Sequence, residues 1–236
     1  MGLHPNSRRV GESESQGRSW DCIERVEAER HRAGTRTQQT HDVVDVLEGA
    51  LEDLGCERLL TVEVWTARGL LTHYVLFVMS LAERVVHIAG ITTRPGEAWM
   101  LQVGRNLIDE DSGALASKRY LIIDRDTKYT RQFRRLVEES GIGVIRLPPM
   151  SPYLNAYAER FVRSIKYECL DRMIFIGQAS LRRAVAEYVE HYHRERNHQG
   201  IDNRLIYAPA AVAVNDGEVR RHARLGGMLN FYYRAA

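Results

Sequence analysis

The 236-residue sequence has little cysteine and little proline, with three and six residues respectively. Cys22, Cys56 and Cys169 form no Cys-x-x-Cys pair and no other metal-ligand spacing, which excludes a zinc finger and a disulfide framework. No apolar run is long enough to cross a membrane, and residues 1–18 lack the apolar segment of a secretory signal. We therefore expect a cytoplasmic protein with reduced thiols.

Net charge is also small, at +2, while the apolar fraction of 44% is sufficient for a sizeable core. The charge is unevenly placed along the chain, because residues 119–236 carry 20 Lys/Arg against 13 Asp/Glu. This basic half is compatible with nucleic acid binding.

The chain divides into four segments by composition. Residues 1–40 are polar and are expected to be disordered or weakly ordered, whereas residues 41–57 have helical apolar spacing that ends at Gly55. Residues 58–210 contain regular strand and helix patterns and form the predicted main domain. Residues 211–236 are a less regular C-terminal tail.

The central segment begins with three apolar, β-branched runs joined by short turns, which indicates an antiparallel meander. Short strands alternating with helices follow, which favours parallel pairing. The predicted fold is α/β, with a mixed five-stranded sheet flanked by helices. The expected strands are 59–65, 70–81, 85–91, 120–123 and 144–147, and the expected helices are 93–108, 131–140, one beginning at 156, and 180–194.

Two carboxylates come from separate elements of this pattern. Asp124 ends the strand 120–123, and Glu159 follows 35 positions later in the first turns of a helix. With no Cys or His nearby at ligand spacing, they suit a hard cation such as Mg²⁺ or Mn²⁺. A turn-forming Asp and a helix-start Glu stabilised by the helix dipole would give the same pattern.

The helix that carries Glu159 has a distinct basic face. At 100° per residue, Arg163 and Lys166 lie within about 40° of Glu159, apart from the apolar stripe of the same helix. A carboxylate that holds a metal beside cations that hold phosphate fits this face, and so do ordinary i, i+4 ion pairs. The candidate DNA-binding residues are Lys128, Tyr153, Asn155, Arg163 and Lys166.

The segments IIDRDTKYT and SPYLNAYAERFVRSIKYECL resemble the second and third acidic motifs of the DDE integrase and transposase superfamily, in particular the integrase core of insertion-sequence transposases. That pattern has an Asp at a strand end and, about 35 residues later, an Asn-Ala-x-x-Glu, here Asn155, Ala156 and Glu159. The later Tyr192, Arg196 and His198 resemble the family's Tyr-x-x-x-Arg-x-His segment. The resemblance covers about residues 58–210 and implies a ribonuclease-H-like fold.

The resemblance also implies an activity. In this family, three carboxylates bind two divalent ions, Mg²⁺ or Mn²⁺, which activate water for DNA strand cleavage and then the freed 3′-hydroxyl for strand transfer. Asp124 and Glu159 would be two of the catalytic and metal-binding acids. The implied partners are double-stranded DNA, as transposon ends and target, and a possible homo-oligomer, with association to the bacterial nucleoid when bound.

The first acid departs from the family pattern. The sequence reads ERLLTVEVW, so Arg58 stands at the usual Asp position. Glu63 on the same strand is the candidate third catalytic and metal-binding carboxylate, although strand alternation points Arg58 and Glu63 to opposite faces. A permanent guanidinium charge opposes metal binding. Two alternatives follow: a catalytically impaired transposase remnant that still binds DNA, and a ribonuclease-H-like nuclease that only hydrolyses.

Two further groups receive ordinary interpretations. His191, His193 and His198 lack a completing cysteine and are interpreted as surface or phosphate-adjacent residues. Trp65 and Trp99 are interpreted as core residues.

Overall fold

The computed structural model of the protein describes residues 53–147, 156–207 and 217–235. The expected disordered segment 1–40 and two DNA-binding candidates, Tyr153 and Asn155, lie outside the described residues. Within these three ranges, no helix has the length and apolar character that crossing a membrane requires.

The centre of the fold is a mixed sheet with strand order β3-β2-β1-β4-β5. The first three strands are antiparallel, whereas β4 pairs parallel with β1, and β5 pairs parallel with β4. A two-residue strand, β6, pairs parallel with the other end of β1. The strands are β1 (Leu54–Thr66), β2 (Gly69–Ser80), β3 (Val86–Thr92), β4 (Tyr120–Ile123), β5 (Gly143–Arg146) and β6 (Phe175–Ile176).

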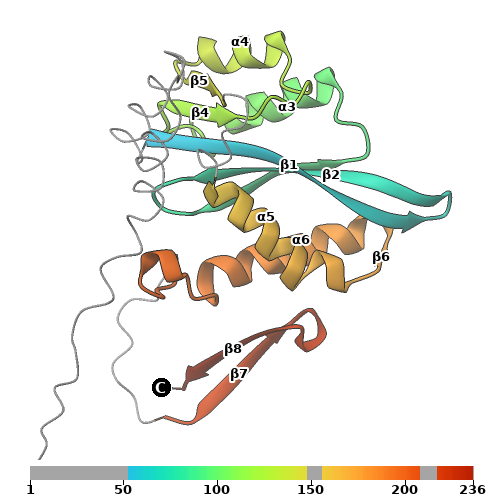
Figure 1. The fold of residues 1–236 in the computed structure, drawn as a ribbon, viewed down its shortest axis with the longest axis vertical. Helices are drawn as coiled ribbons and strands as arrows, with labels where there is room; N and C mark the ends of the chain where they lie inside the picture. The colour runs from blue at the N-terminus through green and yellow to red at the C-terminus, as the bar shows by residue number, and fades with distance from the viewer. Residues whose placement is uncertain (1–52, 148–155, 208–216, 236) are drawn as a thin grey trace, which may run out of the picture.

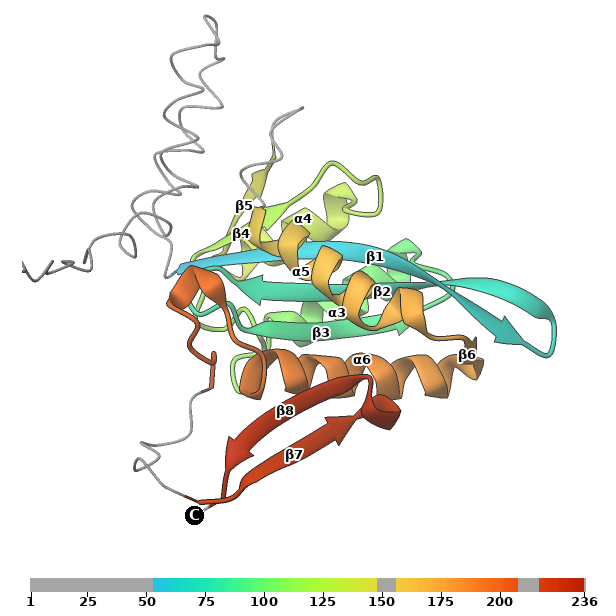
Figure 2. The ribbon, with the colours of Figure 1, turned by 60° about the horizontal axis from the view of Figure 1, so that its bottom comes forward.

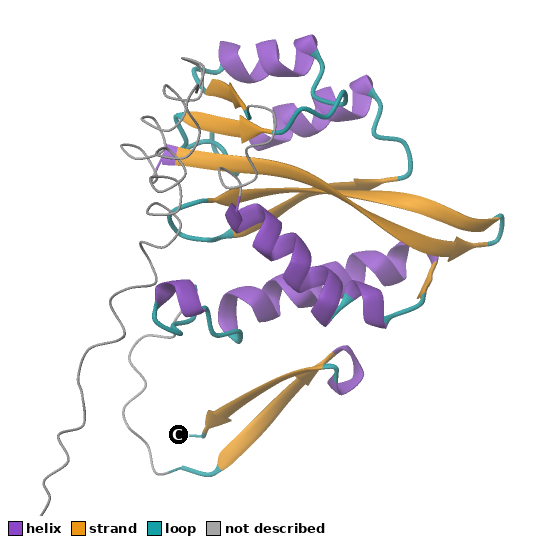
Figure 3. Ribbon diagram, in the orientation of Figure 1, coloured by secondary structure: helices purple, strands orange, loops and turns teal. Residues whose placement is uncertain are grey.

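Helices cover both faces of this sheet, with α3 and α4 on one side and α5 and α6 on the other (Figure 1; Figure 3). They are α3 (Glu97–Leu107), α4 (Arg131–Glu139), α5 (Ala156–Glu168) and α6 (Gly177–Arg194). The predicted α/β fold, a mixed five-stranded sheet flanked by helices, is therefore confirmed, with β6 as a short addition.

Two hydrophobic clusters hold these layers together, one on each face of the sheet. Because strand residues alternate between faces, Leu60, Val62 and Val64 of β1 pack in the cluster that contains α5 and α6. Leu76 and Val78 of β2 lie in the cluster that contains α3 and α4. The sheet is thus buried on both sides, and its strand ends are where polar groups can gather.

Strand β1 begins at Leu54, so the predicted helix end at Gly55 is wrong. Gly55 lies inside the strand, where it pairs with Ser80 of β2 and Leu121 of β4. A Cβ there would stand 2.8 Å from the Leu115 side chain, so the close packing requires glycine. Pairing on both sides, a tertiary effect, overrides the local helix-stop signal.

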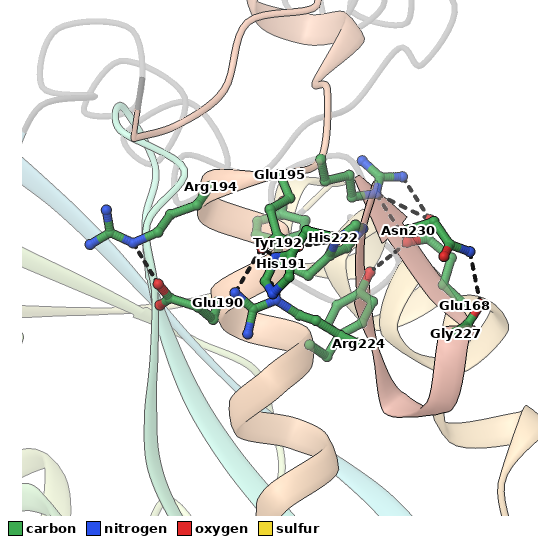
Figure 4. Close-up of polar contacts among 12 residues, drawn as sticks. Glu168, Glu190, His191, Tyr192, Arg194, Glu195, His222, Arg224, Gly227 and Asn230 are labelled. Carbon is green, nitrogen blue, oxygen red and sulfur yellow. Dashed lines mark hydrogen bonds and ion pairs between the residues drawn. The ribbon is translucent and has the colours of Figure 1, made fainter. Parts of the chain in front are cut away.

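The C-terminal tail forms a β-hairpin, β7 (Val219–Arg224) and β8 (Leu229–Arg234), which the sequence pattern left open. It lies beside α6, on the side away from the sheet (Figure 2). The carboxylate of Glu195, directly after α6, binds Arg224 of this hairpin with an oxygen-to-nitrogen distance of 2.7 Å (Figure 4).

Candidate active site at the ends of β1, β4 and α5

Asp124 directly follows the buried strand β4, as predicted. Its Oδ1 atom accepts a hydrogen bond of 2.8 Å from the backbone N–H of Asp126, which fixes the turn that leaves the strand. Asp126 in turn binds Lys128 Nζ at 2.9 Å. Lys128, a predicted DNA contact, therefore has a carboxylate partner within its own loop.

Arg58 lies beside Asp124 in the sheet. Cys56 of β1 pairs with Ile122 of β4 in parallel register, so two residues further along Arg58 is level with Asp124 on the neighbouring strand. Adjacent strands lie about 4.8 Å apart. Arg58 therefore stands where the sequence comparison expects the first acid of the site.

The Arg58 side chain extends to α5 and forms an ion pair with Glu159. The distance between Arg58 Nη1 and Glu159 Oε1 is 3.0 Å, and the two side chains are 27% and 33% exposed. Arg58 thus connects β1, at the level of Asp124, with the Glu159 carboxylate on α5. At such partial exposure the pair contributes at most about 1 kcal/mol to stability, yet it places a fixed positive charge against Glu159.

Glu63 does not join this group, which corrects the prediction of a third carboxylate. Its Oε1 atom accepts a 2.7 Å hydrogen bond from Thr72, at an exposed position on the β1–β2 hairpin. Five residues of β-strand separate it from Arg58, or about 17 Å, and the odd spacing turns its side chain to the other face. No local distortion of β1 compensates for that distance.

The residues at this site do not fit the predicted metal pair. Among the residues that the structure describes, no group of three or more His, Cys, Asp or Glu side chains is arranged to hold a metal ion. Arg58 supplies a cation where the pattern needs a carboxylate, and it already occupies Glu159. Two carboxylates beside an arginine do not neutralise two divalent ions, so no metal-dependent step is derived from this site.

Glu57 is a carboxylate near Asp124 that lies just outside the predicted strand 59–65. It is fully buried within β1, and in the described part of the chain neither carboxylate oxygen has a hydrogen-bond partner. Burial, with a smaller contribution from the charge of Asp124, raises the pKa of Glu57 to about 8. Glu57 is therefore mostly protonated near pH 7, and on the face opposite Arg58 it cannot replace the missing acid.

We expect Glu57→Gln to raise the free energy of unfolding by about 4 kcal/mol at pH 8 and to change it little at pH 4.5. Between pH 4.5 and about 8, the folded protein holds a proton on Glu57 that the unfolded chain releases. The natural protein should therefore lose stability as pH rises through this window, and the glutamine variant should not. Urea unfolding at several pH values measures both curves.

Glu63→Gln is the matched control, because Glu63 is an exposed carboxylate on the same strand. Its effect on the free energy of unfolding should be small and independent of pH. If Glu57→Gln raised the free energy of unfolding equally at pH 5 and pH 8, the stabilisation would not come from removing a buried, ionised Glu57.

The basic face of α5 is present as predicted. Arg163 is exposed and Lys166 is half-buried, one and two turns beyond Glu159. Neither forms an ion pair with another described residue, so both charges remain available to a phosphate. Ala158, Phe161 and Ile165 form the buried stripe of the same helix.

His191, His193 and His198 are all less than 9% exposed, so their interpretation as surface residues is wrong, whereas a position beside phosphate stays a prediction. His193 Nε2 accepts the backbone N–H of Val86 at 2.9 Å, and burial lowers the pKa of His193 to about 4. His198 Nε2 lies 2.7 Å from the carbonyl oxygen of Tyr192. The His193 ring thus connects α6 to the start of β3, and the His198 ring fixes the loop after α6 to the end of that helix.

Comparison with known proteins agrees with the predicted resemblance. Residues 140–205, which include α5 and α6, match the family profile of the integrase core domain. An insertion element IS476 protein of 39.2 kDa from Xanthomonas euvesicatoria is 29% identical over 110 residues. That alignment covers 46% of this chain and 31% of the relative, so the chain spans about a third of the relative's length.

Two solved structures with a similar fold are catalytic cores of retroviral integrases. The HTLV-2 integrase catalytic core in complex with magnesium, in its dimeric form, is 8% identical with a TM-score of 0.46, covering 60% of this chain and 86% of that one. The BIV integrase catalytic core is 12% identical with a TM-score of 0.43, covering 66% and 91%. The resemblance to the integrase core that the sequence motifs predicted is confirmed.

Proposed function

We propose that this chain is the catalytic domain of a DNA transposase or integrase and that it binds double-stranded DNA along α5. One observation supports the proposal: Arg58 of β1, level by register with Asp124 after β4, contacts Glu159 of α5, and these are the three positions at which the resemblance to the integrase core predicts acids. The match of residues 140–205 to the integrase core supports it. Strand cleavage and strand transfer are the reactions that such a site performs when it holds three carboxylates.

The ion pair between Arg58 and Glu159 favours a second candidate, a catalytically impaired transposase that retains DNA binding. In this form Arg58 neutralises the carboxylate that would otherwise bind a metal ion, and the basic residues of α5 are unaffected. Both candidates place DNA on the same face. They differ in whether Mg²⁺ or Mn²⁺ supports cleavage, and homo-oligomer formation is a prediction common to both.

DNA binding is tested with the double variant Arg163→Ala/Lys166→Ala. Each lost phosphate contact should reduce the slope of log affinity against log salt by about 0.9, so the slope should fall by about 2. We also expect affinity at low salt to fall by about tenfold. Fluorescence anisotropy of a labelled duplex across a salt series measures both quantities.

Arg135→Ala is the control for this test, because Arg135 is an exposed arginine of α4 that pairs with Glu139 at 2.8 Å. It removes the same type of charge from the opposite face of the sheet. Salt slopes that are the same for the double variant and for Arg135→Ala would exclude α5 as the DNA-binding face.

A further inference from the structure

A second face of α5 borders a pocket of about 300 Å³ that is separate from Glu159. The pocket lies between the first half of α5, the turn that joins β2 and β3, and the loop after α6. Its lining is rich in arginine. The residues that matter here are Arg84, Tyr157, Arg160, Ser164, Arg196 and Gly200.

Helical geometry separates the three faces of α5. Tyr157, Arg160 and Ser164 repeat at i, i+3 and i+7 and line the pocket. At 100° per residue, their mean direction is roughly 100° from the buried stripe and roughly 125° from the face that carries Glu159. Ligands on the two polar faces therefore do not compete for the same side chains.

Arg84 is held in the pocket by its backbone and by an aromatic ring. Its φ angle is 62°, in the left-handed region, and its guanidinium carbon lies 3.5 Å from the centre of the Tyr157 ring. Its Nε atom is buried and has no hydrogen-bond partner among the described residues. Burial lowers the pKa of Arg84, and the positive charge of Arg160 lowers it further, against opposing contributions from Tyr157 and Tyr192.

Arg160 approaches the same point from α5. A Cβ on Gly200 would stand 3.7 Å from Arg84 Nη1 and 3.8 Å from Arg160 Nη1, so the two nitrogen atoms are at most about 7.5 Å apart. Within the described ranges, neither arginine forms an ion pair with a carboxylate. The third arginine differs, because Arg196 is paired with Glu168 at 2.8 Å.

The guanidinium groups of Arg84 and Arg160 repel each other, and the buried Nε donor of Arg84 makes no hydrogen bond with a described residue. Both features raise the free energy of the folded protein unless an anion binds between the two groups. A phosphate accepts charge-assisted hydrogen bonds of about 2.8 Å, and its oxygens span the separation between the two guanidinium groups. Arginine suits this ligand because its planar donors match phosphate oxygens. Ser164 adds a hydroxyl donor at the same face.

We propose that this pocket binds one phosphate group, through Arg84 and Arg160, and that the phosphate belongs to a DNA strand lying across α5. The assignment to DNA rests on the proposed function, whereas the phosphate chemistry rests on the pocket alone. The pocket would add a further phosphate contact to those of Arg163 and Lys166 on the other polar face of α5. It would fix the orientation of the strand relative to Glu159.

Arg160→Gln tests the proposal in the full chain, with Arg183→Gln as the matched control. Arg160 and Arg183 are both exposed, and Arg183 lies on α6, where it does not line the pocket. We expect Arg160→Gln to weaken binding of a labelled duplex by about fivefold or more and to reduce the salt slope by about 1. Arg183→Gln should have little effect on either quantity.

Inorganic phosphate is the second probe. At millimolar concentration it should raise the melting temperature of the natural chain and of Arg183→Gln, by about 2 °C, and leave that of Arg160→Gln unchanged. If only this effect depends on Arg160 and duplex binding does not, the pocket binds free phosphate and the DNA assignment is overturned. If Arg160→Gln matches Arg183→Gln with both probes, the pocket proposal itself is overturned.

Gly200→Asp provides a variant that does not remove an arginine. Space for its Cβ exists, and its carboxylate would stand between the two guanidinium groups as an internal anion. We expect a higher melting temperature, no further response to inorganic phosphate, and duplex binding as weak as in Arg160→Gln. Loss of stability with unchanged duplex binding would contradict the proposal. If neither the natural chain nor any variant binds duplex DNA, the proposed function is overturned. The melting-temperature response to inorganic phosphate would still show whether the pocket binds phosphate.

Discussion

Arg58→Asp is expected to create a Mn²⁺ site that the natural chain lacks. The substitution removes the guanidinium that holds Glu159 at 3.0 Å and places a carboxylate on β1, level with Asp124. A permanent positive charge is thereby replaced by a negative one among two existing carboxylates. Isothermal titration calorimetry should show at least tenfold tighter Mn²⁺ binding than in the natural chain, or about 1.4 kcal/mol.

Two companion variants separate removal of the cation from addition of the acid. Arg58→Gln frees Glu159 without supplying a third carboxylate, so its Mn²⁺ affinity should lie between those of the natural chain and Arg58→Asp. Asp124→Asn in the Arg58→Asp background should abolish the gain, because it removes the ligand at the end of β4. A duplex nicking assay with Mn²⁺ then reports whether the repaired site is catalytic.

The natural chain itself distinguishes the two candidate functions. If it already binds Mn²⁺ as tightly as Arg58→Asp does, and loses binding on Asp124→Asn, then the ion pair seen here opens readily and another residue completes the site. If only Arg58→Asp binds, Arg58 disables an otherwise intact arrangement. The second outcome is the one that the 3.0 Å contact with Glu159 leads us to expect.

The sequence predicted the elements whose signals are local. Strand β4 is found at Tyr120–Ile123 as expected, because an apolar run ends there at a turn-forming Asp124. Helix α5 is found at Ala156–Glu168 as expected, and its buried stripe follows the helical period. These two elements position Asp124 and Glu159, the two carboxylates of the candidate site.

What the sequence did not show depends on contacts between distant residues. The partner of Arg58 lies 101 positions away, and only the fold reveals that an arginine contacts Glu159. Glu57 seemed to lie off the strand because a carboxylate rarely occupies a fully buried strand position. Trp65, interpreted as core, is 54% exposed because β1 extends beyond the helices that cover the sheet.

One missed element did have a local signal. The hairpin of β7 and β8 turns through Gly226 and Gly227, whose φ angles are 70° and 91°. Two consecutive glycines between alternating segments are typical of a hairpin turn, because only glycine adopts such angles at little cost. The strands themselves were harder to identify, since charged residues make up much of β7.

Glu195→Ala is expected to detach this hairpin from α6. Only 6% of the Glu195 side chain is exposed, and its carboxylate binds Arg224 at 2.7 Å and both His191 and His222 at 2.9 Å (Figure 4). Burial opposes ionisation, but hydrogen bonds from Arg224, His191 and His222 together lower the pKa of Glu195 to about 2. In the folded protein the carboxylate is therefore charged at every pH above about 3. Because the detached group has its ordinary pKa of 4.5, the attachment should weaken progressively as pH falls from about 4.5 to about 2.

Removing a buried partner of this kind costs about 3 kcal/mol, because Arg224 and His191 are left without an acceptor. A loss of that size raises the open population of the hairpin by about a hundredfold. Hydrogen exchange of the β7 and β8 amides, and trypsin cleavage after Arg220 and Arg221, should both accelerate accordingly. Amides of β1 and β2, in the centre of the sheet, should keep their protection.

Glu190→Ala is the matched control, because Glu190 lies on the same helix and forms an exposed ion pair with Arg194. Its loss should change hairpin protection by less than about twofold, since exposed pairs contribute little. A second observation separates charge from packing: Leu229 of β8 is buried in the cluster that contains α6. If the hairpin of Glu195→Ala is as well protected as that of the natural chain, burial of Leu229 holds it in place, and the carboxylate does not.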